Sequence, residues 1–209
     1  MPRCFAFCHG KYLFSIIVHL GSSGKLKMYM IVVALVGMPG SGKSEVARVF
    51  ESGAYRSVRF GDITDAEVMK RGLNLSEENE RAIREDLRKK YGMAAYAILN
   101  LPRIEAALNT SNVVIDGLYS WEEYKFLRDK LGAGLKIVAV WSPPALRYER
   151  LTSRLVRPLT VREAMARDYA EIENVNKGGP IAMADFTISN CGTLGSLLEQ
   201  AENIIKVLK

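Results

Sequence analysis

The chain has 209 residues, of which 48% are apolar and 25% charged, values typical of a soluble globular domain with a sizeable core. Its net charge of +6 gives no indication of a nucleic-acid partner, because residues 1–28 hold four basic residues and no acid and leave only +2 for the rest. Three cysteines are too few for a disulfide framework, which favours a reducing, cytoplasmic location. The only histidines, His9 and His19, exclude a Ser-His-Asp or Cys-His catalytic site from the main domain.

Residues 1–28 are predicted to form an extension outside the core. Their apolar stretch, residues 13–20, is too short to span a membrane, and we expect no membrane partner. A cleaved signal peptide is one alternative interpretation. An upstream start is another, because Met28 and Met30 directly precede the first predicted strand.

A phosphate-binding loop follows the first strand. Residues 31–36, IVVALV, form the continuous apolar run expected of a strand buried on both faces, and residues 45–50 continue as a helix. The intervening residues fit the pattern G-x-x-x-x-G-K-[ST]: Gly37, Met38, Pro39, Gly40, Ser41, Gly42, Lys43 and Ser44. Glycines let backbone N–H groups surround a phosphate, and the helix N-terminus adds a favourable dipole. The loop therefore predicts nucleotide binding, with Lys43 as a catalytic cation and Ser44 as a Mg²⁺ ligand.

The second predicted strand, residues 57–60, ends at an acid. Three helical stretches follow before the next strand, at about residues 62–71, 76–91 and 94–108. That is a long insertion for an α/β unit. Asp62, just beyond the strand, is placed to orient or deprotonate an acceptor hydroxyl, or to hold an acceptor's sugar. The alternative is a helix N-cap.

A third strand, residues 112–116, also ends at an acid. Asp116 stands where a Walker B acid would hold Mg²⁺, directly or through water, with a helix-capping or turn aspartate as the alternative. A fourth strand is predicted at residues 136–141 and a last one at residues 184–189, before a helix over residues 194–208. Alternating strands and helices predict a parallel, doubly wound sheet.

Four arginines follow the fourth strand at helical spacing: Arg147, Arg150, Arg154 and Arg157. The spacing i, i+3, i+7, i+10 places them on one helix face, and Pro158 should end that helix. Phosphoryl transfer needs such charges around the γ-phosphate. The alternatives are a solvated face paired with nearby acids and, for Arg147, a structural pair with an acid. A GTPase is discounted, because the only near match to N-K-x-D, at residues 176–179, lacks the aspartate.

Together these motifs resemble the P-loop nucleotide kinases over residues 29–209. The resemblance is carried by GMPGSGKS, by GD and VIDG at two strand ends, by the arginines, by Arg167-Asp168 and by the tail ADFTISNCGTLGSLLEQ. The tail looks most like dephospho-CoA kinase, and Gly61-Asp62 with the insertion looks more like adenylate and cytidylate kinases. The whole is similar to an archaeal group of dephospho-CoA-kinase-like proteins. Asp65 and Tyr119 depart from the pattern, since arginines that contact the acceptor phosphate are expected there.

The resemblance implies a P-loop NTPase three-layer sandwich: a five-stranded parallel sheet of order 2-3-1-4-5 with helices on both faces. Within the single domain, residues 61–110 would form a helical acceptor-binding insert and residues 147–170 a short arginine-rich lid. We expect ATP- and Mg²⁺-dependent phosphoryl transfer to a nucleotide-like acceptor, of the nucleoside monophosphate or dephospho-CoA type. The alternative function is a P-loop nucleotide-binding regulator or slow ATPase. The oligomeric state stays open.

The implied site residues fall into three groups. Lys43, Asp62, Arg154 and Arg157 are expected to be catalytic. Residues 37–44 are expected to bind the nucleotide, and Ser44 and Asp116 to share Mg²⁺.

Overall fold

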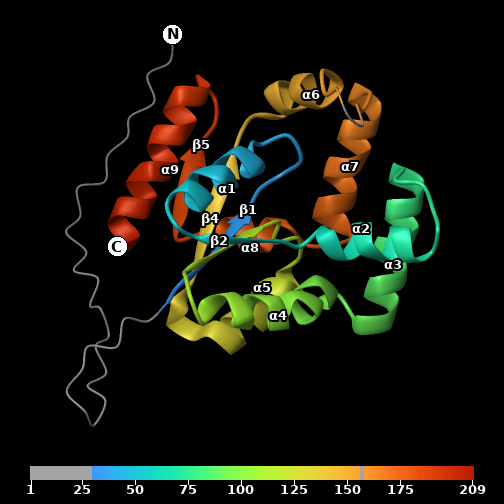
Figure 1. Cartoon of the computed structure of the whole chain (residues 1–209). Coiled ribbons are helices and arrows are strands. Elements are labelled where there is room, and N and C mark those ends of the chain that lie inside the picture. Colours follow the sequence, from blue (N-terminus) through green and yellow to red (C-terminus); the bar gives the residue numbers. More distant parts are fainter. Residues whose placement is uncertain (1–29, 156–157) are drawn as a thin grey trace.

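The computed structural model of the protein describes residues 30–155 and 158–209, so the N-terminal extension and Arg157 lie outside the described residues. Figure 1 shows one sheet between layers of helices. Its five strands are β1 (Val32–Val36), β2 (Arg56–Arg59), β3 (Val113–Asp116), β4 (Leu135–Trp141) and β5 (Phe186–Ser189). Every pairing is parallel and the order is β2-β3-β1-β4-β5, which confirms the predicted sheet.

Apart from α6 and α8, the helices begin and end close to the predicted positions. They are α1 (Lys43–Ser52), α2 (Asp62–Lys70), α3 (Glu77–Tyr91), α4 (Ala95–Leu108), α5 (Trp121–Leu131), α6 (Pro144–Thr152), α7 (Val161–Glu173), α8 (Gly178–Ala182) and α9 (Leu194–Leu208), with a 3-10 turn at Gly132–Gly134. Capping boxes open α5, with Ser120 and Glu123, and α7, with Thr160 and Glu163; both pairs have the S/T-x-x-E spacing typical of this motif. The short α8 was not predicted, because its sequence GGPIA is rich in residues that disfavour helices.

The core has two halves, one on each face of the sheet. Along β1, Val33 and Leu35 face the layer of α1 and α9, whereas Val32, Ala34 and Val36 face that of α4 and α5. All five residues are at most 1% exposed. Because both faces are covered, β1 has a continuous apolar run instead of an alternating pattern. Within the described parts of the chain, no helix has the length and apolar character needed to cross a membrane.

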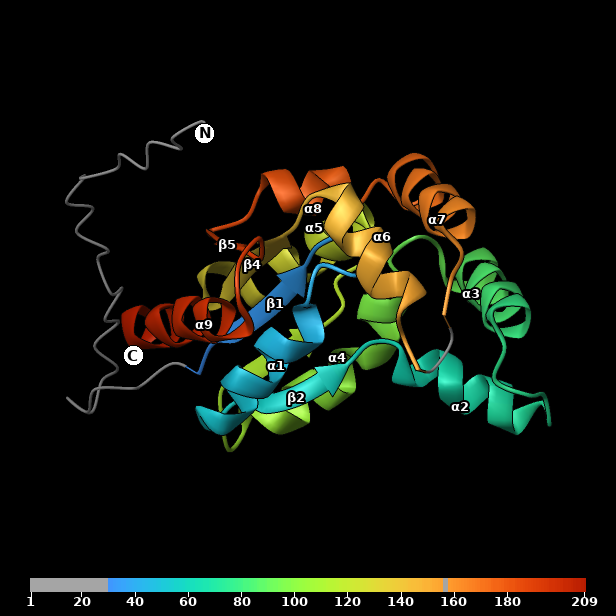
Figure 2. The same ribbon diagram turned by 90° about the horizontal axis from the view of Figure 1, so that it is seen from above.

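The insertion after β2 divides into two parts. Helix α4 packs on the sheet, since Tyr96, Ala97 and Ile104 belong to the core on that face. Helices α2 and α3 lie beyond the ends toward which the strand arrows point, and α7 lies there too (Figure 2). An ion pair of 3.6 Å between Arg167 and Glu77 joins α7 to α3. These helices therefore surround the edge of a parallel sheet at which ligands bind.

The prediction that one helix face carries all four arginines is wrong. Helix α6 ends at Thr152, so Arg147 and Arg150 lie within it and Arg154 lies beyond it. The hydroxyls of Thr152 and Ser153 donate to carbonyl oxygens of the last turn, at 2.9 and 3.4 Å. Such bonds compete with the helical pattern and favour a helix end. The helical spacing of the arginines thus extends beyond the C-terminal end of α6.

Glu123, in the capping box of α5, is fully buried, at 0% exposure. Its Oε2 accepts hydrogen bonds from the backbone N–H groups of Tyr119 and Ser120. Its Oε1 has no hydrogen-bond partner among the described residues. Burial raises the pKa of Glu123 to about 7, and the bonds from the two N–H groups oppose that rise.

The Glu123 carboxyl should make stability depend on pH. Its pKa is raised above the usual 4.5, so its contribution is fully present below pH 4.5 and is lost as pH rises through about 7. We expect wild type to lose about 2–3 kcal/mol of unfolding free energy between pH 4.5 and 8 relative to Glu123→Gln, which keeps an acceptor oxygen for the cap. Urea titrations across this range measure the difference. Parallel pH profiles for the two proteins would contradict this assignment.

Candidate active site

The phosphate-binding loop joins β1 to α1 and depends on its glycines. Gly40 has a φ of +77° and Gly42 a φ of +98°, conformations that favour glycine. A Cβ at Gly40 would lie 2.7 Å from the Arg147 carbonyl oxygen, and one at Gly42 would lie 2.5 Å from the Asn190 amide nitrogen. Both positions therefore require glycine for backbone conformation and for close packing.

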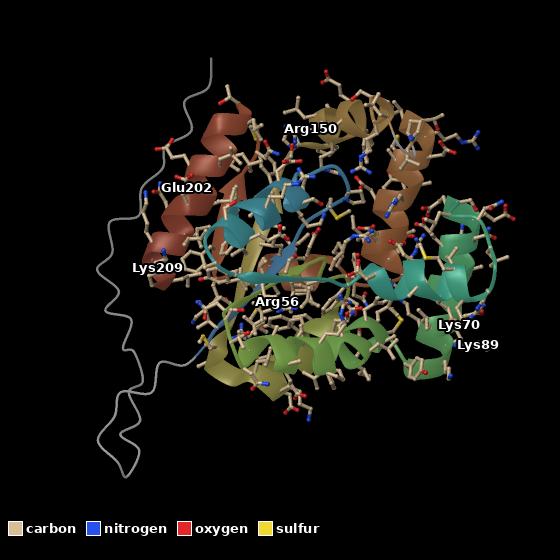
Figure 3. The ribbon with its side chains drawn as sticks, viewed as in Figure 1. Arg56, Lys70, Lys89, Arg150, Glu202 and Lys209 are labelled. Carbon is tan, nitrogen blue, oxygen red and sulfur yellow. The ribbon has the colours of Figure 1, made fainter. Side chains whose placement is uncertain are left out.

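Three side chains from distant parts of the chain hold the loop's carbonyl groups. Arg147 donates to the Pro39 oxygen at 3.2 Å, and Arg150 to the Gly40 oxygen at 3.4 Å. Asn190 donates to the oxygen of Ser41 at 2.8 Å. Arg150, labelled in Figure 3, reaches from α6 to the loop and also bonds Asn190. Sequence reasoning missed the role of Asn190, although its place just after β5 puts it at the same edge of the sheet.

A buried ion pair fixes α6 to α7. Arg147 donates to the two carboxylate oxygens of Asp168 at 2.8 and 2.6 Å, and the two side chains are only 5% and 7% exposed. Tyr148 donates to the same carboxylate at 2.9 Å. This confirms that Arg147 pairs with an acid. Because Arg147 also bonds the loop, the ion pair couples α7 to the shape of the phosphate site.

Lys43 begins α1 and turns back over the loop. Its ammonium donates to the carbonyl oxygens of Gly37 and Met38 at 2.9 and 3.1 Å. Burial lowers the pKa of Lys43 to about 7; the charge of Lys177 lowers it further, while Glu171 and Asp116 oppose the shift. An anion placed against Lys43 would favour its charged form. The lysine is therefore set to respond electrostatically to a bound phosphate.

The two predicted metal ligands lie side by side. The hydroxyl of Ser44, on α1, donates to Oδ2 of Asp116, at the end of β3, at 3.2 Å. Adjacent oxygen ligands of an octahedral Mg²⁺ are about 3.0 Å apart, given bonds of 2.0–2.1 Å. The residues therefore fit a shared Mg²⁺ ion, which stays a prediction. They meet because β1, which leads into α1, pairs directly with β3.

Asp62 opens α2 but does not cap it. The N-cap residue is Gly61, so the N-cap alternative is wrong. The Asp62 carboxylate instead accepts from Arg59 at 3.1 Å and from Arg103 at 2.9 Å. Asp65 also binds Arg59, at 2.7 Å. Asp65 stands where an arginine is expected from the resemblance, and its carboxylate binds Arg59, at the end of β2.

Arg154 lines a pocket of about 380 Å³ that is bounded by the phosphate loop and the start of α1. Arg150, Asn190 and the start of α9 form its other walls. Arg154 therefore lies close to the loop even though it is not on α6. Its partner in the sequence prediction, Arg157, lies outside the described residues.

The sequence analysis also missed a group of charges on and near α7 that act on the pKa of Lys43. Lys177, just before α8, is 2% exposed and pairs with Glu171 of α7. Arg167 pairs with Glu171 as well, at 3.4 Å. The sequence motif Arg167-Asp168 pointed to this segment, whereas Lys177 was noted only as part of the discounted near match to N-K-x-D.

The fold is that of known P-loop kinases. A gluconokinase from Sinorhizobium meliloti aligns with a TM-score of 0.55 at 17% identity, over 87% of this chain and 95% of that one. A shikimate kinase from Acinetobacter baumannii in complex with shikimate aligns at 0.54 with 16% identity, over 86% and 93%. A dephospho-CoA kinase from Campylobacter jejuni aligns at 0.53 with 14% identity, over 85% and 96%. At these identities the likeness establishes the fold alone.

Sequence relatives are much closer than these structures. A UPF0200 protein from Thermococcus kodakarensis is 40% identical over 167 residues, which are 78% of this chain and 90% of that protein. One from Sulfurisphaera tokodaii is 34% identical over 179 residues, 84% and 96% of the two chains. The protein belongs to the UPF0200 family of archaeal proteins, and its residues 33–173 match the family model of an AAA domain. This agrees with the resemblance to archaeal kinase-like proteins.

Loss of the buried ion pair should weaken both the fold and the phosphate site. Asp168→Ala leaves the Arg147 guanidinium buried without its carboxylate, so we expect a loss of about 3–5 kcal/mol of unfolding free energy and weaker ATP binding. Glu149→Ala changes an exposed acid on α6, the helix that carries Arg147, and should stay within about 0.5 kcal/mol of wild type. Urea denaturation and calorimetric ATP titration measure the two effects. Equal stability of the two variants would show that the pair contributes little.

Proposed function

We propose that the protein catalyses ATP- and Mg²⁺-dependent phosphoryl transfer to a nucleotide-like small-molecule acceptor. The observation that carries this proposal is the convergence of the loop, Lys43, Ser44 and Asp116 at one edge of the sheet. Helices α2, α3 and α7 surround the same edge, on the side where an acceptor would approach (Figure 2). An enclosed position next to the γ-phosphate keeps water away from the transfer.

In the proposed reaction, an oxygen of the acceptor, from the phosphate group of a nucleoside monophosphate or from a hydroxyl, forms a bond to the γ-phosphorus. The bond from that phosphorus to the bridging oxygen breaks and ADP leaves with the additional negative charge; where the acceptor is a hydroxyl, its proton passes to a base. Bound Mg²⁺ would neutralise charge on the phosphates. Lys43 and the loop's N–H groups would hold the β- and γ-phosphates in place. These roles are assigned to residues whose positions fit them.

Asp62 is the proposed base or orienting group for the acceptor. A carboxylate has about four lone-pair positions, and each Asp62 oxygen accepts one bond from an arginine. Asp62 can therefore still accept a hydroxyl proton while Arg59 and Arg103 fix its orientation. The two guanidinium groups are balanced by the carboxylates of Asp62 and Asp65, so this cluster adds no net charge to the acceptor side.

Arg154 is the proposed mobile cation of the site. It lies beyond the end of α6 and lines the pocket beside the loop. From this position its guanidinium would reach the transferring phosphate in a closed state, as part of the short lid over residues 147–170. The ion pair between Arg147 and Asp168 joins the first residue of that region to its C-terminal part.

A screen of acceptors tests the proposal. Wild type is incubated with ATP, Mg²⁺ and, in turn, AMP, CMP, dephospho-CoA and nucleosides, and products are identified by mass. We expect one class of acceptor to gain a phosphoryl group. Lys43→Ala should lower that turnover by a factor of about 10²–10³ or more with the fold intact, whereas Lys89→Ala, on the outer side of α3, should not.

Three results would contradict the proposal. Unchanged turnover in a folded Lys43→Ala variant would show that the loop does not act on phosphate. Release of inorganic phosphate alone, with every acceptor unmodified, would favour a slow ATPase or nucleotide-binding regulator. Acceptors that raise ATP turnover without being phosphorylated would point the same way.

A further inference from the structure

Helix α7 has a row of large, exposed apolar side chains. They are Val161, Met165, Tyr169 and Ile172, with exposed fractions of 53%, 40%, 58% and 50%. At 3.6 residues per turn, the four side chains lie within an arc of about 80° and over a length of about 16 Å. Single exposed apolar residues are normal on a protein surface, but a continuous row of them indicates an interaction surface. We call these four residues the α7 stripe.

The contacts that hold α7 in the fold come from a different side of the helix. Asp168 pairs with Arg147 of α6 at 2.6 Å, and Arg167 pairs with Glu77 of α3 at 3.6 Å. The helix lies at the periphery of the molecule (Figure 2). Helix α7 is therefore fixed on its inner side, whereas the α7 stripe remains exposed to solvent.

Two residues of opposite charge border the α7 stripe. Arg162 lies near the start of α7 and Glu173 at its end, and both are exposed. Neither side chain has an ion-pair partner in the part of the chain that the structure describes. The two residues lie about 20° apart around the helix axis, along the same edge of the stripe. That edge therefore has a free positive charge at one end and a free negative charge at the other.

This arrangement is complementary to a second copy of itself. Antiparallel packing of two α7 helices about a twofold axis brings together three kinds of pair: Val161 with Ile172, Met165 with Tyr169, and Arg162 with Glu173. The midpoint of each pair falls within half a residue of position 167, so one register satisfies all three. In a twofold interface every such contact is made twice. Apolar residues thus meet apolar residues, and each charge meets its opposite.

We propose that the protein forms a homodimer in which the α7 stripes of two copies pack antiparallel, with Arg162 of each copy paired to Glu173 of the other. The inference goes beyond the proposed function and does not depend on it. A stripe of this length buries less than the roughly 800 Å² per partner of a standard interface. The dimer is therefore reversible, with an expected Kd of about 10–100 µM.

Sedimentation velocity of the full chain, at concentrations from below to above that Kd, tests the proposal. The mean mass should rise from that of the monomer toward twice that value. Met165→Glu places a charge in the middle of the interface and should raise the Kd about tenfold or more. Met69→Glu makes the same change at a methionine of α2 that is 67% exposed, and should leave the Kd within about twofold of wild type.

Exchange of the two bordering charges tests the antiparallel register. Arg162→Glu places like charges opposite each other at both ends of the interface and should raise the Kd about three- to tenfold at low ionic strength. Glu173→Arg should have the same effect. The double variant, Arg162→Glu with Glu173→Arg, restores opposite charges and should return the Kd to within about twofold of wild type.

Three results would overturn the proposal. One is a wild type that stays monomeric at the highest concentration, which would leave the α7 stripe to a partner of another kind. Another is a dimer that Met165→Glu does not weaken, or that Met69→Glu weakens equally. The third is a double charge variant that dimerises no better than either single variant. All of these substitutions are at exposed positions, where the fold tolerates change, and circular dichroism checks that each variant is folded.

Discussion

The phosphate site depends on how the carbonyl groups of its loop are held. Three consecutive loop carbonyls accept hydrogen bonds from Arg147, Arg150 and Asn190, which come from α6 and from the segment after β5. In a planar trans peptide the N–H and C=O groups point in opposite directions. Carbonyls that are bonded from outside therefore turn N–H groups toward the phosphate. The loop's glycines permit this shape, and distant side chains stabilise it.

The same contacts join the chemistry of the site to the arrangement of the helices. Asp168 pairs with Arg147, so α7 is fixed against α6 and, through it, against the loop. One residue before Asp168, Arg167 extends toward Glu171 and toward Glu77 of α3. One stretch of α7 thus supports the loop, contributes to the charges around Lys43 and contacts the insert. A change in any one of these three contacts is expected to alter the other two.

Local patterns in the sequence were sufficient for most of the fold. The apolar run of β1, the capping boxes at Ser120 and Thr160 and the glycine after α3 are signals carried by neighbouring residues, and the structure agrees with each. The position of the candidate site could be predicted from the sequence for a similar reason. In a parallel sheet, the residues that follow the carboxyl ends of neighbouring strands meet at one edge. Asp116 ends β3, and Ser44 follows the loop after β1, so the two come within hydrogen-bond distance.

Tertiary structure decided where charged side chains find their partners. The spacing of the four arginines predicted that they share one helix face. Hydrogen bonds from the hydroxyls of Thr152 and Ser153 favour an earlier end of the helix. The first two arginines bind carbonyl groups of the loop. The burial of Lys177 has no local signal, because it depends on pairing with the carboxylate of Glu171 on α7. Periodicity and caps act over a few residues and can be read from the sequence. Compensation of buried charge acts between distant segments, so only the folded chain determines it.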